Sequence, residues 1–124
     1  MELSRKLARK QFSPTDIQTI LQTLVKEALL SNQRFLENFI HYRRNKGYGP
    51  LRIHAELLER GLPQDLIEQS LNTADEKWQE YARFVWKKRF KNTLPSDFKA
   101  RVQQIRFLQY RGFTQDQIES IFKK

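Results

Sequence analysis

The stretch that decides the fold occurs twice in this chain: residues 57–71 read LLERGLPQDLIEQSL, and residues 108–122 read LQYRGFTQDQIESIF. Seven of the fifteen aligned positions are identical, where chance would give about one. Each copy has the pattern of a helix end, a glycine stop, an apolar side chain and a second helix with an acidic first turn. A more diverged copy, which includes Leu7, Phe12 and Leu21, lies 50 residues before the first. The repetition predicts tandem modules, each too small to be stable alone.

Apolar residues elsewhere recur with the period of an α-helix, and no alternation typical of a strand persists. Two successive stripes predict two separate helices before Gly47: Ile17, Ile20, Leu21, Leu24, Val25 and Ala28 in the first, and Phe35, Phe39 and Tyr42 in the second. Ser13 before Pro14 predicts an N-cap, and Thr114 with Gln117 is typical of a capping box. We therefore expect an all-α fold, an elongated, curved array of tandem three-helix repeats with about eight helices and no sheet. The expected repeats span residues 1–30, 31–74 and 75–124.

The chain is strongly basic, and the excess charge lies in its last third. Its 124 residues include 23 Lys and Arg against 14 Asp and Glu, which gives a net charge of +9. Residues 77–124 carry twelve basic and four acidic side chains, or +8 of that total. This asymmetry favours a polyanion or an acidic protein surface as partner. A solvated basic face that only aids solubility would have the same composition.

Cellular location can also be predicted from what the sequence lacks. No apolar run is long enough to cross a membrane, and no apolar segment typical of a secretory signal follows Met1. The chain has no cysteine, which excludes a disulfide scaffold and fits a reducing compartment. We therefore expect a cytoplasmic protein without membrane contact.

Two basic clusters are candidate binding sites. The first surrounds the turn at residues 47–50, where Tyr48 could face a ligand or pack between helices, and the cations could contact phosphates or only complement a helix end. The second is the run at residues 87–91, which could bind phosphates or be a solvated helix face. Trp78 fits the core stripe, whereas Trp86 could pack there or stack on bases. The candidate residues are Arg43, Arg44, Lys46, Tyr48, Arg52, Arg83, Lys87, Lys88, Arg89, Lys91, Arg106 and Arg111.

Catalytic and metal-binding patterns are missing from the sequence. His41 and His54 lie thirteen residues apart on different predicted helices, without carboxylates at a ligand spacing. Nucleophile elbows, paired catalytic acids and glycine-rich phosphate cradles are also absent. We therefore expect neither an enzyme nor a bound metal or cofactor.

One family resemblance covers nearly the whole chain. The residues Arg34-Phe35-Leu36-Glu37, then Gly47-Tyr48-Gly49-Pro50-Leu51-Arg52-Ile53, Glu56-Leu57 and Gly61-Leu62, resemble the RecX family of bacterial RecA regulators. Residues 105–113, IRFLQYRGF, also look like the end of a RecX protein. Family members usually carry a further helix before the segment that matches Leu3–Lys10. The resemblance therefore implies that the first repeat lacks its first helix.

The resemblance also implies a function. It implies a protein, expected as a monomer, that binds along the RecA filament on DNA and inhibits the ATPase, strand-exchange and co-protease activities of RecA. The implied processes are DNA recombination, DNA repair and the SOS response. The expected partners are RecA and single- or double-stranded DNA, bound without sequence specificity.

Two other functions fit the sequence. One is a helix-turn-helix-like or non-specific DNA-binding protein that acts without RecA. Acidic residues in the candidate recognition helices, Asp65 and Glu68 in one copy and Asp116 and Glu119 in the other, argue against sequence reading by those helices. The other is a scaffold that binds only protein.

Overall fold

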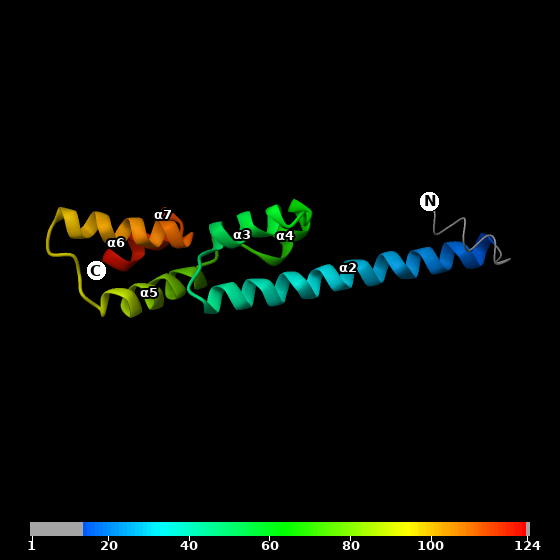
Figure 1. Ribbon diagram of the computed structural model, residues 1–124, viewed down its shortest axis with the longest axis horizontal. Coiled ribbons are helices and arrows are strands. Elements are labelled where there is room, and N and C mark those ends of the chain that lie inside the picture. The colour runs from blue at the N-terminus through cyan, green and yellow to red at the C-terminus, as the bar shows by residue number, and fades with distance from the viewer. Residues whose placement is uncertain (1–13, 124) are drawn as a thin grey trace. The chain divides into compact units, whose positions relative to one another are not determined.

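The computed structural model describes residues 14–123, and these form helices without any strand (Figure 1). The six helices are α2 (Pro14–Asn45), α3 (Pro50–Glu59), α4 (Gln64–Ser70), α5 (Lys77–Phe90), α6 (Phe98–Arg111) and α7 (Gln115–Phe122). The all-α class is therefore confirmed. The expected helix over Leu3–Lys10 and the N-cap at Ser13 lie outside the described residues.

The expectation of about eight helices is wrong at one place within the described residues. The two helices expected before Gly47 form the single 32-residue helix α2. No glycine or proline stands between Pro14 and Gly47, and the residues at 26–30, KEALL, are strong helix formers. The helix therefore continues to Asn45, and the turn that follows contains Gly47, which has a positive φ of 93°.

The chain divides into two compact units, residues 1–35 and 36–124. In the first unit the predicted stripe is helical, but none of its described side chains is buried. Leu24, Val25 and Leu29 are all more than two-fifths exposed. The stripe therefore has no apolar cover among the described residues of this unit.

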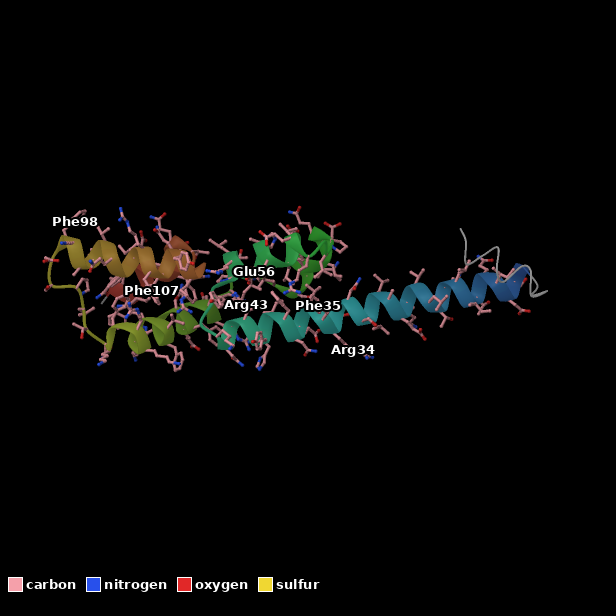
Figure 2. The ribbon with its side chains drawn as sticks, viewed as in Figure 1. Arg34, Phe35, Arg43, Glu56, Phe98 and Phe107 are labelled. Atoms are coloured by element: carbon pink, nitrogen blue, oxygen red, sulfur yellow. The ribbon has the colours of Figure 1, made fainter. Side chains whose placement is uncertain are left out.

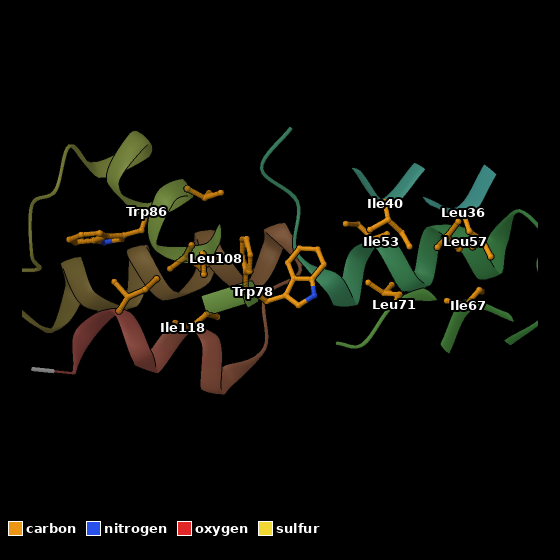
Figure 3. Close-up of a cluster of buried hydrophobic side chains, with 14 residues drawn as sticks. Leu36, Ile40, Ile53, Leu57, Ile67, Leu71, Trp78, Trp86, Leu108 and Ile118 are labelled. Atoms are coloured by element: carbon orange, nitrogen blue, oxygen red, sulfur yellow. The ribbon is translucent and has the colours of Figure 1, made fainter. Parts of the chain in front are cut away.

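The second unit begins with a three-helix core built from the last part of α2 together with α3 and α4. Its buried side chains come from all three helices and the residue that follows α4 (Figure 3): Leu36, Ile40, Ile53, Leu57, Ile67 and Leu71. Leu57 and Ile67 are fully buried, and at the matching repeat positions Leu108 and Ile118 are at most 2% exposed. The repeat in the sequence is thus a repeat of buried positions.

Helices α5, α6 and α7 form the rest of the core. The buried apolar side chains of these helices and of the turn between α6 and α7 include both tryptophans (Figure 3): Trp78, Ala82, Val85, Trp86, Leu108, Phe113, Ile118 and Ile121. The predicted capping box begins α7, because the Thr114 hydroxyl accepts from the Gln117 backbone and the Gln117 side chain accepts from the Thr114 backbone. Gln117 also donates to the carbonyl oxygen of Thr73 at 2.7 Å, which fixes α7 to the segment before α5.

Two glycine turns bring the two halves of the second unit together. The backbone N–H of Gly49 donates to the carbonyl oxygen of Arg111 (2.6 Å), and that of Leu51 donates to the carbonyl oxygen of Gly112 (2.9 Å). A Cβ on Gly49 would lie 2.5 Å from the Gly112 backbone, and one on Gly112 would lie 2.6 Å from the backbone nitrogen of Arg52. Only residues without a side chain allow this approach.

Three alanine substitutions separate the cost of backbone conformation from the cost of crowding. Gly61 has a φ of +83° and open space around it, Gly49 has an ordinary φ of −89° but no space, and Gly112 has a φ of +98° and no space. We expect Gly61→Ala to lower the free energy of unfolding by about 1 kcal/mol and Gly49→Ala by about 2–3 kcal/mol. Gly112→Ala combines both costs and should lower it most. Urea unfolding measures all three, and equal losses at Gly61 and Gly49 would contradict the tight turn contact.

Candidate functional site

A hollow of about 730 Å³ lies where the end of α2 and the Gly47 turn meet α5 and α6. Three aromatic side chains line it, Tyr81, Phe84 and Phe107. Five cations line it with them, and they are Arg44, Lys46, Lys88, Arg89 and Arg111. Glu80 is the one acidic side chain among the lining residues. The hollow is therefore apolar at its wall and strongly positive, which suits a flat or apolar anionic ligand.

All five of these cations belong to the predicted set, and the fold explains how they meet. Arg44 lies in the last turn of α2, and Lys46 follows the helix, just before Gly47 with its positive φ. Lys88 and Arg89 lie on the exposed side of α5, because the opposite side of this helix is buried in the core. The buried residues are Trp78, Ala82, Val85 and Trp86. Arg111 ends α6 immediately before the Gly112 turn.

Aromatic rings, rather than carboxylates, hold three of the arginines. The Arg44 guanidinium lies 4.7 Å from the centre of the Tyr81 ring. Those of Arg89 and Arg111 lie 5.5 and 5.1 Å from the Phe107 ring. These cation–π contacts position the guanidinium groups without neutralising them. Their positive charge therefore stays available to a ligand.

Arg44 has unused hydrogen-bonding capacity at this site. One of its terminal nitrogens lies 2.9 Å from Nδ1 of His41. Its Nε is buried and has no hydrogen-bond partner. Because this Nε is enclosed by the protein, any contact of Arg44 with a ligand would involve its terminal nitrogens.

The Tyr48 ring has a structural role in the contact between the two halves of the unit. The guanidinium carbons of Arg43, Arg52 and Arg111 lie 3.8, 4.5 and 5.0 Å from its centre. Arg52 also donates to the carbonyl oxygen of Tyr110 at 3.3 Å, and Arg111 to that of Lys46 at 3.2 Å. These contacts bind the Gly47 turn to the end of α6. The geometry therefore supports packing for Tyr48.

Arg43 is paired within the protein. Its Nε and a terminal nitrogen donate to the two carboxylate oxygens of Glu56 at 3.0 and 2.8 Å (Figure 2). Burial alone lowers the pKa of Arg43, but the hydrogen bonds and charge of Glu56 outweigh it, with a contribution from Tyr48, and the pKa is raised overall. Arg43 is thus charged but already neutralised by a partner.

The remaining predicted residues lie away from the hollow. Arg83 and Lys87 line a second hollow of about 520 Å³ together with Glu76 and Glu80, so acids and cations there are equal in number, whereas the first hollow has five cations and Glu80 alone. Arg83 also donates to the carbonyl oxygen of Ser120 at 3.2 Å. Lys91 ends α5 in a left-handed conformation, with a φ of 51°. Arg106 is exposed on α6 and lines neither hollow.

The aromatic residue that the sequence interpretation missed is Phe84. Both tryptophans are at least 95% buried, and Nε1 of Trp86 donates to Gln104 at 2.8 Å, so neither ring can stack on a base. Phe84 is 66% exposed and lines both hollows. A signal for it was present, because Phe84 falls between Ala82 and Val85 outside the buried stripe of α5.

Residues 14–123 contain neither a metal-ligand cluster nor a membrane-spanning helix. No group of three His, Cys, Asp or Glu side chains there could hold a metal ion. None of the helices in that range has the length and apolar content needed to cross a membrane.

Two domain models of one known family match two long segments of the chain. The model of the second three-helix domain of RecX matches residues 31–71, and that of the third three-helix domain matches residues 75–122. A "Regulatory protein RecX" of Pseudomonas putida is 46% identical over 95% of this chain and 76% of its own length. Another, of Pseudomonas fluorescens, is 42% identical over 98% of this chain and 78% of its own length.

The paired Arg43 and the unpaired Lys46 should behave differently when removed. We expect Arg43→Ala to lower the free energy of unfolding by about 1–2 kcal/mol, because it leaves Glu56 half-buried without its partner. Among the contacts described, the ammonium of Lys46 contacts only the Tyr42 ring, at 5.3 Å from its centre. Lys46→Ala should therefore change the free energy of unfolding by less than about 0.5 kcal/mol. Urea unfolding checks both values. An Arg43→Ala protein of unchanged stability would show that the pair is not structural.

Proposed function

The chain belongs to the RecX family, and from this membership we propose that it regulates RecA by binding the RecA–DNA filament. In this proposal it inhibits the ATPase, strand-exchange and co-protease activities of RecA. The matches to regulatory proteins along nearly the whole chain support the partner and the process. The proposed organisation is three tandem repeats at residues 1–30, 31–74 and 75–124, and the two matched domains fall within the second and third.

The observation that carries the proposal from family to mechanism is the positive hollow. A RecA filament on DNA is a polyanion wrapped in protein, so a partner needs cations that its own acids do not neutralise. Arg44, Lys88 and Arg89 meet this need, because none of them forms an ion pair with a carboxylate among the described residues, and Glu80 is the one acid that lines the hollow with them. A protein that binds one filament state more tightly than another shifts the filament towards that state. Inhibition then follows from differential affinity, without catalysis by the bound chain.

The structure gives little support to the alternative of sequence reading by a helix-turn-helix. The candidate recognition helices, α4 and α7, have seven and eight residues and begin with acidic first turns. Ile67, Ile118 and Gln117 on these helices are buried. Acidic helices that are held in the core are poorly suited to the major groove. Non-specific DNA binding without RecA remains the second candidate, because the same cations would serve it.

Single-stranded-DNA-dependent ATP hydrolysis by RecA tests the proposal. We expect the wild-type chain to inhibit it at a concentration below that of RecA. Reversal of two exposed lysines of the hollow, Lys46→Glu with Lys88→Glu, should raise the half-inhibitory concentration about tenfold, because two phosphate contacts become repulsive.

A matched control removes the effect of net charge. Lys99→Glu with Lys123→Glu makes the same change in net charge at exposed positions that line neither hollow. This pair should leave inhibition within about twofold of wild type, since distant exposed charges are screened by salt. Equal losses in both pairs would assign the effect to net charge rather than to the hollow. A wild-type chain that leaves ATP hydrolysis unchanged would overturn the proposed function.

A further inference from the structure

Of the three aromatic side chains that line the hollow, Phe84 is the one whose ring faces make no described contact with another ring or a cation. Tyr81 carries the guanidinium of Arg44, and Phe107 carries those of Arg89 and Arg111. Phe107 also packs edge-on against Phe90 at 5.4 Å. Within the described residues Phe84 makes no ring–ring or cation–π contact, and it is 66% exposed. A large apolar ring is thus presented to solvent inside a positive depression.

The surroundings of this ring define the chemistry of what would cover it. Lys88 lies one helical turn after Phe84 on α5, and Lys46 lines the same hollow from the end of α2. With Arg44, Arg89 and Arg111, the lining has five cations against the single carboxylate of Glu80. A volume of about 730 Å³ is in the range of pockets that hold small ligands. The complementary ligand therefore combines a flat apolar face with negative charges close to it.

We infer that the hollow binds single-stranded nucleic acid, with one nucleobase stacked on Phe84 and the neighbouring phosphates held by the cations around it. This inference rests on the proposed function, since it names the part of the DNA–protein filament that the hollow contacts. A single strand has unstacked bases whose faces are accessible, whereas a duplex presents only base edges and phosphates. An exposed ring among cations is the arrangement by which proteins bind single strands without reading their sequence.

The measurement is the fluorescence anisotropy of a labelled oligothymidylate, with a sugar–phosphate oligomer of the same length but without bases as the second probe. No RecA is present. We expect Phe84→Ala to weaken oligothymidylate binding about tenfold, and to change binding of the base-free oligomer by less than about twofold. Phe84→Trp, which retains an aromatic face, should bind as the wild type does. Phe84→Leu, which retains apolar volume but no aromatic face, should resemble Phe84→Ala.

Phe98→Ala is the matched control. Phe98 is 80% exposed at the start of α6 and lines neither hollow (Figure 2), so its removal should leave both affinities unchanged. Circular dichroism and urea unfolding should show wild-type folding for every variant, because neither ring is in the core. An equal loss on both probes, or the same loss in Phe98→Ala, would overturn the stacking role.

The outcomes separate this inference from the proposed function. If Phe84→Ala weakens inhibition of RecA but binds oligothymidylate normally, the ring contacts protein and the inference is wrong while the proposed function stands. If the wild type does not inhibit RecA and yet shows the expected preference for oligothymidylate, the proposed function fails and the stacking site stands.

Discussion

The close approach of two glycine turns is the constraint on which the rest of the second unit depends. Gly49 and Gly112 meet backbone to backbone, and a Cβ on either would overlap the other chain segment. Because the backbone of Gly49 bonds to Arg111, the start of α3 is fixed against the end of α6. The wall of the hollow formed by Lys46, Gly47 and Arg111 follows from that contact. The hollow is thus a consequence of how two repeats of the same pattern meet.

The contact also distinguishes the two copies of the repeat, because only one repeat glycine lies against another segment of the chain. Gly61 and Gly112 occupy equivalent positions and both have a positive φ. Around Gly61 the space is open, whereas the Arg52 backbone lies against Gly112. The conformation of the turn is therefore a property of the repeat, but the docking surface belongs to one copy. At Gly112 the same glycine both ends a helix and contacts the backbone of residues 49–52.

Local features could be predicted from the sequence because local chemistry determines them. The positive φ of the repeat glycines Gly61 and Gly112, the capping box at Thr114 and the buried positions shared by the two repeats all follow from short-range patterns. The pairing of Arg43 with Glu56 could not be predicted, because it joins side chains from two helices through their packing. The continuity of α2 differs from the expected pair of helices for another reason. A change of apolar stripe suggests a break, but no glycine or proline stands between the stripes to end the helix.

The distribution of charge between the repeats gives an incomplete account of the site. The basic excess lies after residue 76, yet two of the five cations in the hollow, Arg44 and Lys46, come from the nearly neutral region before it. Conversely, Arg83 and Lys87 belong to the basic region but have acidic neighbours. What makes a cation available is its environment, because a guanidinium on an aromatic ring keeps a charge that a carboxylate would neutralise. The positive potential of the hollow is therefore determined by which side chains face each cation, and that is a property of the fold rather than of composition.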